Sequence, residues 1–239
     1  IIEALHHSGV YYGRHVDIQL VDGEELDESN IEEVIGDSDG ILVPGGFGLR
    51  GVEGKILAAH RARTCKVPYL GICLGMQVAV CEFARNACGM EGANSTEFVP
   101  ECEYPVIDIM PDQEEITDKG GTMRLGAYPC KVKEGTLAAE AYGESLVYER
   151  HRHRFEVNNA YRDRLAKEGL VFAGLSPDDR LVEMVELPED MHPWFVAAQF
   201  HPEFKSRPTR PQPLFREFVR AAIARHEGVD RKSVERCSE

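Results

Sequence analysis

The 239-residue sequence has little positive charge and lacks long apolar runs, and each shortage excludes a class of protein. It carries 27 Lys and Arg against 41 Asp and Glu, which gives a formal net charge of −14 at pH 7. Such an acidic surface argues against nucleic acid or an anionic membrane as a partner. No apolar run approaches the length of a membrane span, and no signal peptide is visible at the start.

The sequence also lacks paired cysteines of the kind that staple a chain or bind zinc. Its seven cysteines are odd in number, and none forms a C-x-x-C pair. A chain of this length can bury a core without covalent cross-links. We therefore expect reduced thiols and a cytoplasmic protein with no metal site.

The stretch that organises the chain is Val67–Gln77, an apolar run that turns through Gly-Ile-Cys-Leu-Gly and continues with a helical pattern. Gly71 and Gly75 flank Cys73 and suit a tight turn from strand to helix. The pattern predicts a nucleophile elbow that holds Cys73 at a helix N-terminus, where we expect the thiolate to be favoured. The alternative is a small buried cysteine, the commonest fate of a lone Cys.

The fold class follows from strands and helices that alternate along the first part of the chain. Strands are predicted at 15–21, 40–44 and 67–72, and helices at 1–7, 27–35, 51–64 and 76–85. This order predicts an α/β protein with a mostly parallel central sheet flanked by helices. Ligands bind such sheets at the carboxyl ends of the strands, where Cys73 and the Gly45–Gly46 loop fall.

The second half of the chain predicts strands with turns between them, and thus a small additional antiparallel sheet. The expected strands are 105–110, 123–132, 146–157, 170–175, 181–187 and 195–200, with helices at 161–168 and 211–226 and a loose loop at 111–121. No linker is visible, so residues 1–226 form one domain. Residues 227–239 are charged and poor in apolar residues, which predicts a disordered tail.

His201 and Glu203 follow an apolar strand, as Cys73 does. A thiol nucleophile needs a base, and the base needs a carboxylate to orient it. Pro202 should keep His201 extended, so that the side chains at 201 and 203 point the same way. By itself, His-Pro-Glu would be an ordinary strand exit with a solvated histidine. Together with the elbow, it predicts a Cys73–His201–Glu203 triad.

The glycine loop at Pro44-Gly45-Gly46-Phe47-Gly48 can bring backbone N–H groups close to a ligand. A phosphate cradle is one interpretation, but the loop lacks the Lys-Ser/Thr of a P-loop and the G-x-G-x-x-G spacing. A merely flexible turn is another. An oxyanion hole made by the N–H groups of Gly46 and Leu74 fits better.

The motifs P-G-G-F-G, G-I-C-L-G-M-Q and Q-F-H-P-E-F occur here in the order typical of class I (triad) glutamine amidotransferases, which the chain therefore resembles. The resemblance implies their flavodoxin-like fold. It also implies their chemistry, in which the cysteine attacks the side-chain amide of L-glutamine and a γ-glutamyl thioester is hydrolysed to glutamate. Three further motifs resemble the amidotransferase domains of the CTP synthase family: N-S-T-E-F from Asn94, G-G-T-M-R-L-G from Gly120 and E-R-H-R-H-R-F-E-V-N from Glu149.

This resemblance implies a glutamine pocket with one cation and one anion. Arg154 would clamp the α-carboxylate, and Glu97 would meet the α-ammonium. The remaining implied binding residues are Gly46, Leu74, Gly75, Met76 and Gln77. The alternatives are that Glu97 is a surface acid and that the basic strand around Arg154 is solvated. A metal site at His151 and His153 lacks a third ligand.

The resemblance also implies parts that this sequence does not contain. The strand that normally precedes the first helix is absent, as is the N-terminal amidoligase domain that aminates UTP in cis with ATP and Mg. The family pattern adds GTP as an activator and a homotetramer. Rival hypotheses are the glutaminase domain of a GMP synthetase, a stand-alone γ-glutamyl peptidase, and a regulatory module without activity.

Overall fold

The computed structural model describes residues 1–109 and 123–237. The helices are α1 (Ile2–Tyr12), α2 (Ile31–Ile35), α3 (Val52–Thr64), α4 (Leu74–Asn86), α5 (Leu137–Tyr142), α6 (Arg162–Lys167) and α7 (Pro213–Glu227). The strands are β1 (Ile41–Val43), β2 (Tyr69–Ile72), β3 (Ala93–Ser95), β4 (Tyr104–Ile109), β5 (Arg124–Val132), β6 (Leu146–His153), β7 (Phe155–Val157), β8 (Val171–Leu175), β9 (Val182–Leu187) and β10 (Phe195–Ala198). Short 3₁₀ helices are η2 (Asn159–Tyr161), η3 (Pro202–Lys205) and η4 (Arg231–Ser233).

The larger sheet has seven strands in the order β1-β2-β10-β9-β8-β5-β6. β2 runs parallel to both β1 and β10, while every pairing from β10 to β6 is antiparallel. The predicted α/β fold is confirmed, but the sheet is mixed rather than mostly parallel. Antiparallel neighbours need no crossover helix, which fits the small number of helices in the second half of the chain.

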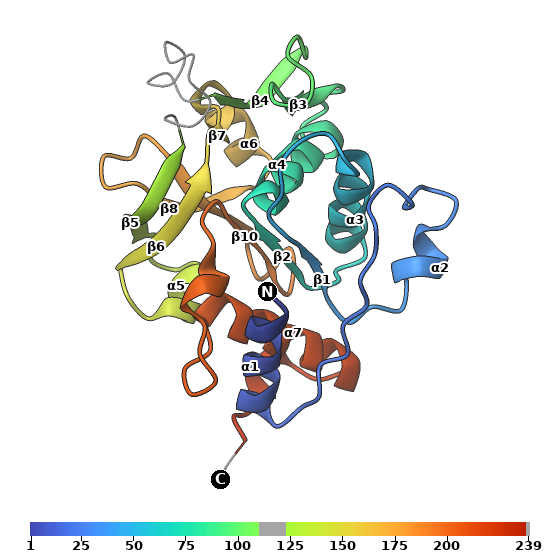
Figure 1. Ribbon diagram of the computed structural model, residues 1–239, viewed down its shortest axis with the longest axis vertical. Helices are drawn as coiled ribbons and strands as arrows, with labels where there is room; N and C mark the ends of the chain where they lie inside the picture. The colour runs from blue at the N-terminus through green and yellow to red at the C-terminus, as the bar shows by residue number, and fades with distance from the viewer. Residues whose placement is uncertain (110–122, 238–239) are drawn as a thin grey trace.

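The smaller sheet has the order β3-β4-β7 and lies beside the end of α4 (Figure 1). β3 pairs with β4 in parallel, and β4 pairs with β7 in antiparallel fashion. The predicted second sheet is therefore present, with one parallel pair that the sequence did not indicate.

Two hydrophobic cores lie on the two faces of the larger sheet. Tyr69 belongs to the core that includes α3 and α4, whereas its neighbour Leu70 belongs to the core that includes α1, α5 and α7. Successive side chains of a strand point to opposite faces, so the apolar run of β2 supplies both cores. Figure 1 shows α1 packed beside α7 and α3 beside α4.

Some predicted elements differ from the structure. Residues 15–21 form no strand, and the predicted helix at 27–35 begins only at Ile31, with Asn30 at its N-cap. The predicted strand at 146–157 is interrupted at Arg154, which separates β6 from β7. The expected loop at 111–121 and the start of the motif from Gly120 lie outside the described residues.

The predicted disordered tail is wrong for the part of it that the structure describes. After α7, the side chain of Asp230 caps η4 by accepting the N–H of Lys232. Arg231 is buried at 6% exposure and forms ion pairs that the sequence did not reveal; its partners are Glu140, Glu189 and Glu217. The prediction of disorder from charge failed here because this arginine has acidic partners elsewhere in the domain.

Among the helices of the two described ranges, none is both long and apolar enough to cross a membrane.

Candidate active site

Cys73 occupies the junction between β2 and α4 with φ 54° and ψ −102°, a backbone conformation that costs a non-glycine residue about 1–3 kcal/mol. Its N–H donates to the carbonyl of Ala198 on β10 over 2.7 Å. The flanking glycines permit close packing: a Cβ on Gly71 would lie 2.7 Å from the Gly75 oxygen, and one on Gly75 would lie 2.0 Å from the Val43 oxygen. The predicted elbow geometry is therefore present.

His201 lies just beyond β10, the strand that pairs with β2. Its Nδ1 lies 2.9 Å from Oε1 of Glu203, and within the described residues its buried Nε2 has no hydrogen-bond partner. A Cβ on Gly45 would lie 2.8 Å from His201 Cε1 and 3.5 Å from Cys73 Cβ. Both residues thus lie against Gly45, and a carboxylate on Nδ1 leaves Nε2 as the basic nitrogen.

The backbone that joins the histidine to its acid differs from the prediction. His201 has φ −109° and ψ 81°, outside the regular extended region that was predicted, and Pro202 begins the 3₁₀ helix η3. Glu203 therefore reaches the imidazole through a turn rather than through the alternation of an extended strand. Proline is well suited to the first position of a helix, because its missing N–H would lack an intrahelical partner there.

The surroundings of Cys73 oppose the thiolate that the sequence predicts at this position. Burial raises the pKa of Cys73 to about 12, and the N–H of Leu74 at the start of α4 only partly opposes this rise. The carboxylates of Glu156, Glu203 and Glu97 raise the pKa further. A helix N-terminus stabilises a thiolate, but full desolvation destabilises it by a larger amount. The nucleophile must therefore lose its proton to a base during the reaction.

The predicted oxyanion hole brings the glycine loop against the elbow. A Cβ on Gly46 would lie 3.2 Å from Cδ2 of Leu74. The N–H of Leu74 is directed at the Cys73 sulfur, where it lowers the thiol pKa. The glycine loop thus lies against the elbow, and the oxyanion hole made by the N–H groups of Gly46 and Leu74 stays a prediction.

A small pocket opens beside the thiol. Its lining comprises Gly46, Phe47, Cys73, Gln77, Glu97, His153, Arg154 and Phe155. Glu97 accepts the N–H of Gly48 over 3.4 Å, and burial raises the pKa of Glu97 while Arg154 opposes that rise. The pocket therefore places one cation and one anion near the sulfur, as the sequence predicted.

Three of the predicted binding residues do not line this pocket. Met76 is fully buried in the core and Gly75 faces β1. Leu74 is 2% exposed and can contribute only its backbone N–H. These residues lie in the first turn of α4, whose side chains mostly face the core, and only Gln77 of this segment reaches the pocket.

The structure adds residues that the sequence did not single out. Nε2 of Gln199 lies 3.7 Å from the Cys73 sulfur, and the Phe47 ring has the Arg152 guanidinium 5.5 Å from its centroid. Gln199 stands two residues before His201, a spacing that could have indicated a shared side of the strand. His153 and Phe155 join the pocket because the chain bends at Arg154.

The alternative of a solvated basic face holds for Arg150 and Arg152, which lie on the exposed side of β6. Exposed and buried side chains alternate along β6, with His151 and His153 inside. His153 lies 2.6 Å from Glu156, and Arg124 lies 2.7 Å from Glu183. Burial, reinforced by Arg124, lowers the pKa of His151 to about 2. In residues 1–109 and 123–237, no group of three or more His, Cys, Asp or Glu side chains could hold a metal ion.

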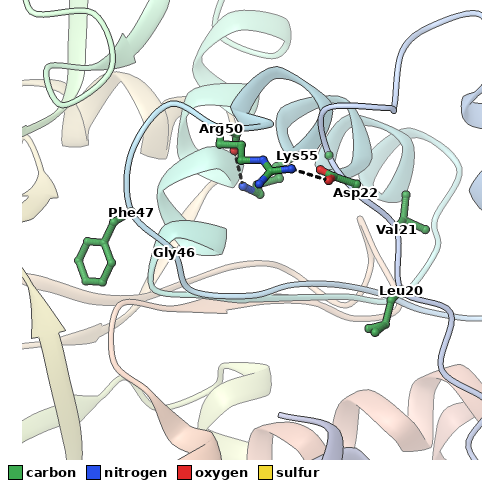
Figure 2. A pocket seen from close by; sticks show the side chains of 8 residues that line it. Leu20, Val21, Asp22, Gly46, Phe47, Arg50 and Lys55 are labelled. Carbon is green, nitrogen blue, oxygen red and sulfur yellow. Dashed lines mark hydrogen bonds and ion pairs between the residues drawn. The ribbon is translucent and has the colours of Figure 1, made fainter.

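A second, more open pocket lies on the other side of the glycine loop. Its lining comprises Leu20, Val21, Asp22, Gly23, Gly46, Phe47, Arg50 and Lys55. Figure 2 shows Arg50 directed at Asp22 while the Phe47 ring points away from them. No member of the triad lines this pocket, so the pocket beside Cys73 is the candidate substrate site.

The fold, the elbow and the His201–Glu203 pair together define a class of enzyme. The family model of the class-I glutamine amidotransferases matches residues 1–221. The chain belongs to this family. Within it, the chain is similar to the glutaminase domains of CTP synthases, as both sequence and structure show.

The relatives give the scale of this similarity. The CTP synthase of Caldanaerobacter subterraneus subsp. tengcongensis is 61% identical over 223 residues, which are 93% of this chain and 41% of that protein. The CTP synthase of Moorella thermoacetica is 60% identical over 228 residues, which are 95% of this chain and 42% of that protein. The chain thus spans less than half the length of these relatives.

Among solved structures, the glutaminase domain of Trypanosoma brucei CTPS with bound acivicin superposes with a TM-score of 0.86 at 41% identity. The match covers 93% of this chain and 86% of that one. The similarity therefore extends over nearly the whole domain.

Proposed function

We propose that this chain hydrolyses L-glutamine to glutamate and ammonia through a γ-glutamyl thioester on Cys73. The observation that carries the proposal is the meeting of a strained elbow cysteine with the His201–Glu203 pair across Gly45. The pocket beside the thiol offers Arg154 and Glu97, which suit the two charges of a free amino acid.

The first step uses the histidine as a base. Nε2 of His201 takes the thiol proton as the Cys73 sulfur attacks the side-chain carbonyl carbon of glutamine. The carbonyl oxygen becomes an oxyanion that the N–H groups of Gly46 and Leu74 stabilise. Glu203 stabilises the imidazolium. The protonated His201 then gives its proton to the leaving nitrogen, which departs as ammonia and leaves the thioester.

The second step hydrolyses the thioester. His201 takes a proton from a water molecule, and the resulting hydroxide attacks the thioester carbonyl carbon. The second oxyanion collapses, the carbon–sulfur bond breaks, and the thiolate regains a proton from His201. Glutamate leaves, and Cys73 returns to the neutral thiol that the buried site favours.

We also propose that the ammonia serves an amidoligase domain that converts UTP to CTP with ATP and Mg. The support is the similarity to CTP synthases of which the chain covers 41–42%. On the same ground, the domain would be the glutaminase half, residues 1–226, of an enzyme with the ligase domain in cis, a homotetrameric assembly and GTP as activator.

A coupled assay of glutamate release tests the hydrolase proposal. The protein should release glutamate from L-glutamine, and Cys73→Ala should reduce the rate to background. In the full-length enzyme, the same variant should still make CTP from UTP with free ammonia. Release of glutamate only from γ-glutamyl peptides would favour a peptidase instead, and synthesis of GMP would favour a GMP synthetase.

A further inference from the structure

Gln199 directly follows β10, two residues before His201, and its side chain is fully buried behind the thiol. Its Nε2 lies 3.7 Å from the Cys73 sulfur, and its Oε1 lies 3.3 Å from Nε2 of Gln77. Gln77 Nε2 also donates to the carbonyl of Phe155 over 3.1 Å. The side chains of Gln77 and Gln199 therefore form a chain of hydrogen bonds from the backbone beside Arg154 to the Cys73 sulfur.

The hydrogen bonds fix which way both amides face. The Phe155 carbonyl can only accept, so the atom of Gln77 that faces it must be the NH₂ group. The same NH₂ group faces Gln199, so Gln199 must present its oxygen to it. The NH₂ group of Gln199 must then point at the sulfur. This orientation follows from a backbone acceptor and requires no assumption about the thiol.

We propose that Gln199 is a positioning residue that holds the Cys73 sulfur with an N–H donor and stabilises it selectively once it is deprotonated. The proposal rests on the proposed glutaminase function and adds a residue to it. The sulfur has a second polar neighbour, the carbonyl of Arg152 at 3.9 Å, which can accept the proton of the thiol but repels a thiolate. Gln199 therefore favours the reactive form and Arg152 the resting form.

The charged groups around the sulfur raise the free-energy cost of a thiolate, and an N–H donor lowers that cost. The titratable and charged groups that face it, or that line its pocket, are Glu97, His153, Arg154, Glu156, His201 and Glu203. Three of them are carboxylates that disfavour a negative sulfur. A neutral donor lowers the cost of the thiolate without adding a charge that would itself need a partner.

The test measures the ionisation of Cys73 rather than activity alone. The rate of iodoacetamide alkylation at Cys73 is followed from pH 6 to 11 by peptide mass spectrometry, with the exposed Cys65 as an internal reference for the reagent. Gln199→Met keeps the length of the side chain but removes the donor. Its alkylation profile should move up by about one pH unit. Its kcat for glutamate release should fall about tenfold, with a KM within about threefold of wild type.

Other variants separate this role from packing. Gln199→Glu keeps the size and an acceptor but places a carboxylate against the sulfur, so its profile should move further in the same direction. The control is Gln19→Met, at an exposed glutamine distant in sequence from Gln199. This variant should change neither the alkylation profile of Cys73 nor kcat. If Gln199→Met does not fold, as judged by circular dichroism, Gln199→Glu carries the test.

The outcomes are distinct. An unchanged alkylation profile in a folded Gln199 variant overturns the inference. A rise in KM with no change in kcat also overturns it, because that result would indicate only a displaced Gln77. A wild-type protein that releases no glutamate overturns the proposed function. The alkylation profiles would still decide the role of Gln199 in that case.

Discussion

The position of Cys73 at the start of a helix and its burial act on the pKa of its thiol in opposite directions. The start of α4 favours a thiolate, but burial raises the pKa of Cys73 to about 12. Deprotonation of this thiol therefore needs a base, and Nε2 of His201 is the candidate. In such a site, the base and the acid that orients it contribute directly to the rate.

Glu203→Gln tests that contribution. The amide can still accept a hydrogen bond from Nδ1 of His201, but it no longer stabilises the imidazolium that forms when the thiol is deprotonated. The kcat for glutamate release should fall by about 10²- to 10⁴-fold, with little change in KM. Steady-state kinetics measure both. A kcat within twofold of wild type would exclude Glu203 from the triad.

Arg154→Lys tests the glutamine pocket. Lysine keeps the positive charge but loses the planar fork that can hold a carboxylate with two hydrogen bonds. We expect KM for glutamine to rise about 10- to 100-fold, with a smaller effect on kcat. The matched control is Arg150→Lys, four residues earlier on the exposed face of β6. An equal rise in KM for both variants would contradict the assignment.

Among the secondary-structure elements, β2 and α4 can pack closely at the elbow because each contributes a glycine there. Gly71 and Gly75 face each other across the turn, and Ala197 of β10 also lies close to Gly71. Parallel pairing of β2 with β10 then places Cys73 and the residues after Ala198 at the same edge of the sheet. The triad is therefore a property of strand order as much as of residue type.

Gly71→Ala should damage this arrangement. The new Cβ would lie 2.7 Å from the backbone of Gly75 and 2.9 Å from the Ala197 side chain, so α4 must shift. We expect a loss of about 1–3 kcal/mol in the free energy of unfolding and a marked fall in glutaminase activity. Chemical denaturation and the glutamate assay measure the two effects.

The control for that substitution is Gly135→Ala. Gly135 has φ +78°, but a Cβ at this position would have no described atom within 4 Å, so the substitution introduces only backbone strain. Its activity should stay at the wild-type level. Equal loss of activity in both variants would mean that the close contact at Gly71 is not what holds Cys73 in place.

The sequence predicted the elements that position the site better than those at its margins. The apolar runs of β1, β2 and β10 and the elbow were recognisable because burial and turn chemistry agree there. Residues 15–21 instead alternate between polar and apolar side chains, as a half-buried strand would, yet Leu20 is 79% exposed and no strand forms. Alternation reports which side chains can be buried, but it does not show whether the backbone has a pairing partner.

The same limit applies to the candidate site. The triad and the charged pair in the pocket were recognisable from motifs, because each residue type follows from the chemistry. The role of Gln199 and the burial of His151 and His153 depend on contacts between distant strands. The raised pKa of Cys73 also depends on how deeply the surrounding chain buries the thiol, which no local sequence pattern shows.

In the molecule as a whole, the segment that follows α7 packs against the rest of the domain and stabilises it. Arg231 crosses from η4 to acidic residues on α5, on α7 and before β10, and its guanidinium lies 5.7 Å from the centroid of the Trp194 ring. These elements cover the face of the sheet opposite to α3 and α4. The segment thus stabilises the core that lies behind β10.

Arg231→Ala should therefore destabilise the domain. It would remove one of three arginines around the buried carboxylate of Glu217, which keeps Arg216 and Arg220, at a cost of about 1–2 kcal/mol in the free energy of unfolding. Lys232→Ala removes an exposed partner of Glu189 from the same segment and should have a much smaller effect. Thermal unfolding distinguishes them. Identical melting temperatures for both variants and wild type would mean that the tail does not fasten the fold.

Three distant segments of the chain meet around Cys73, which we propose as the nucleophile that attacks glutamine. A glutamine analogue that carries an electrophilic diazoketone in place of the amide tests it most directly, with intact mass and peptide mapping as the measurement. We expect one adduct, on Cys73, that excess L-glutamine prevents and that His201→Ala slows strongly. An adduct on any other cysteine, or labelling of Cys73 that glutamine does not affect, would contradict it.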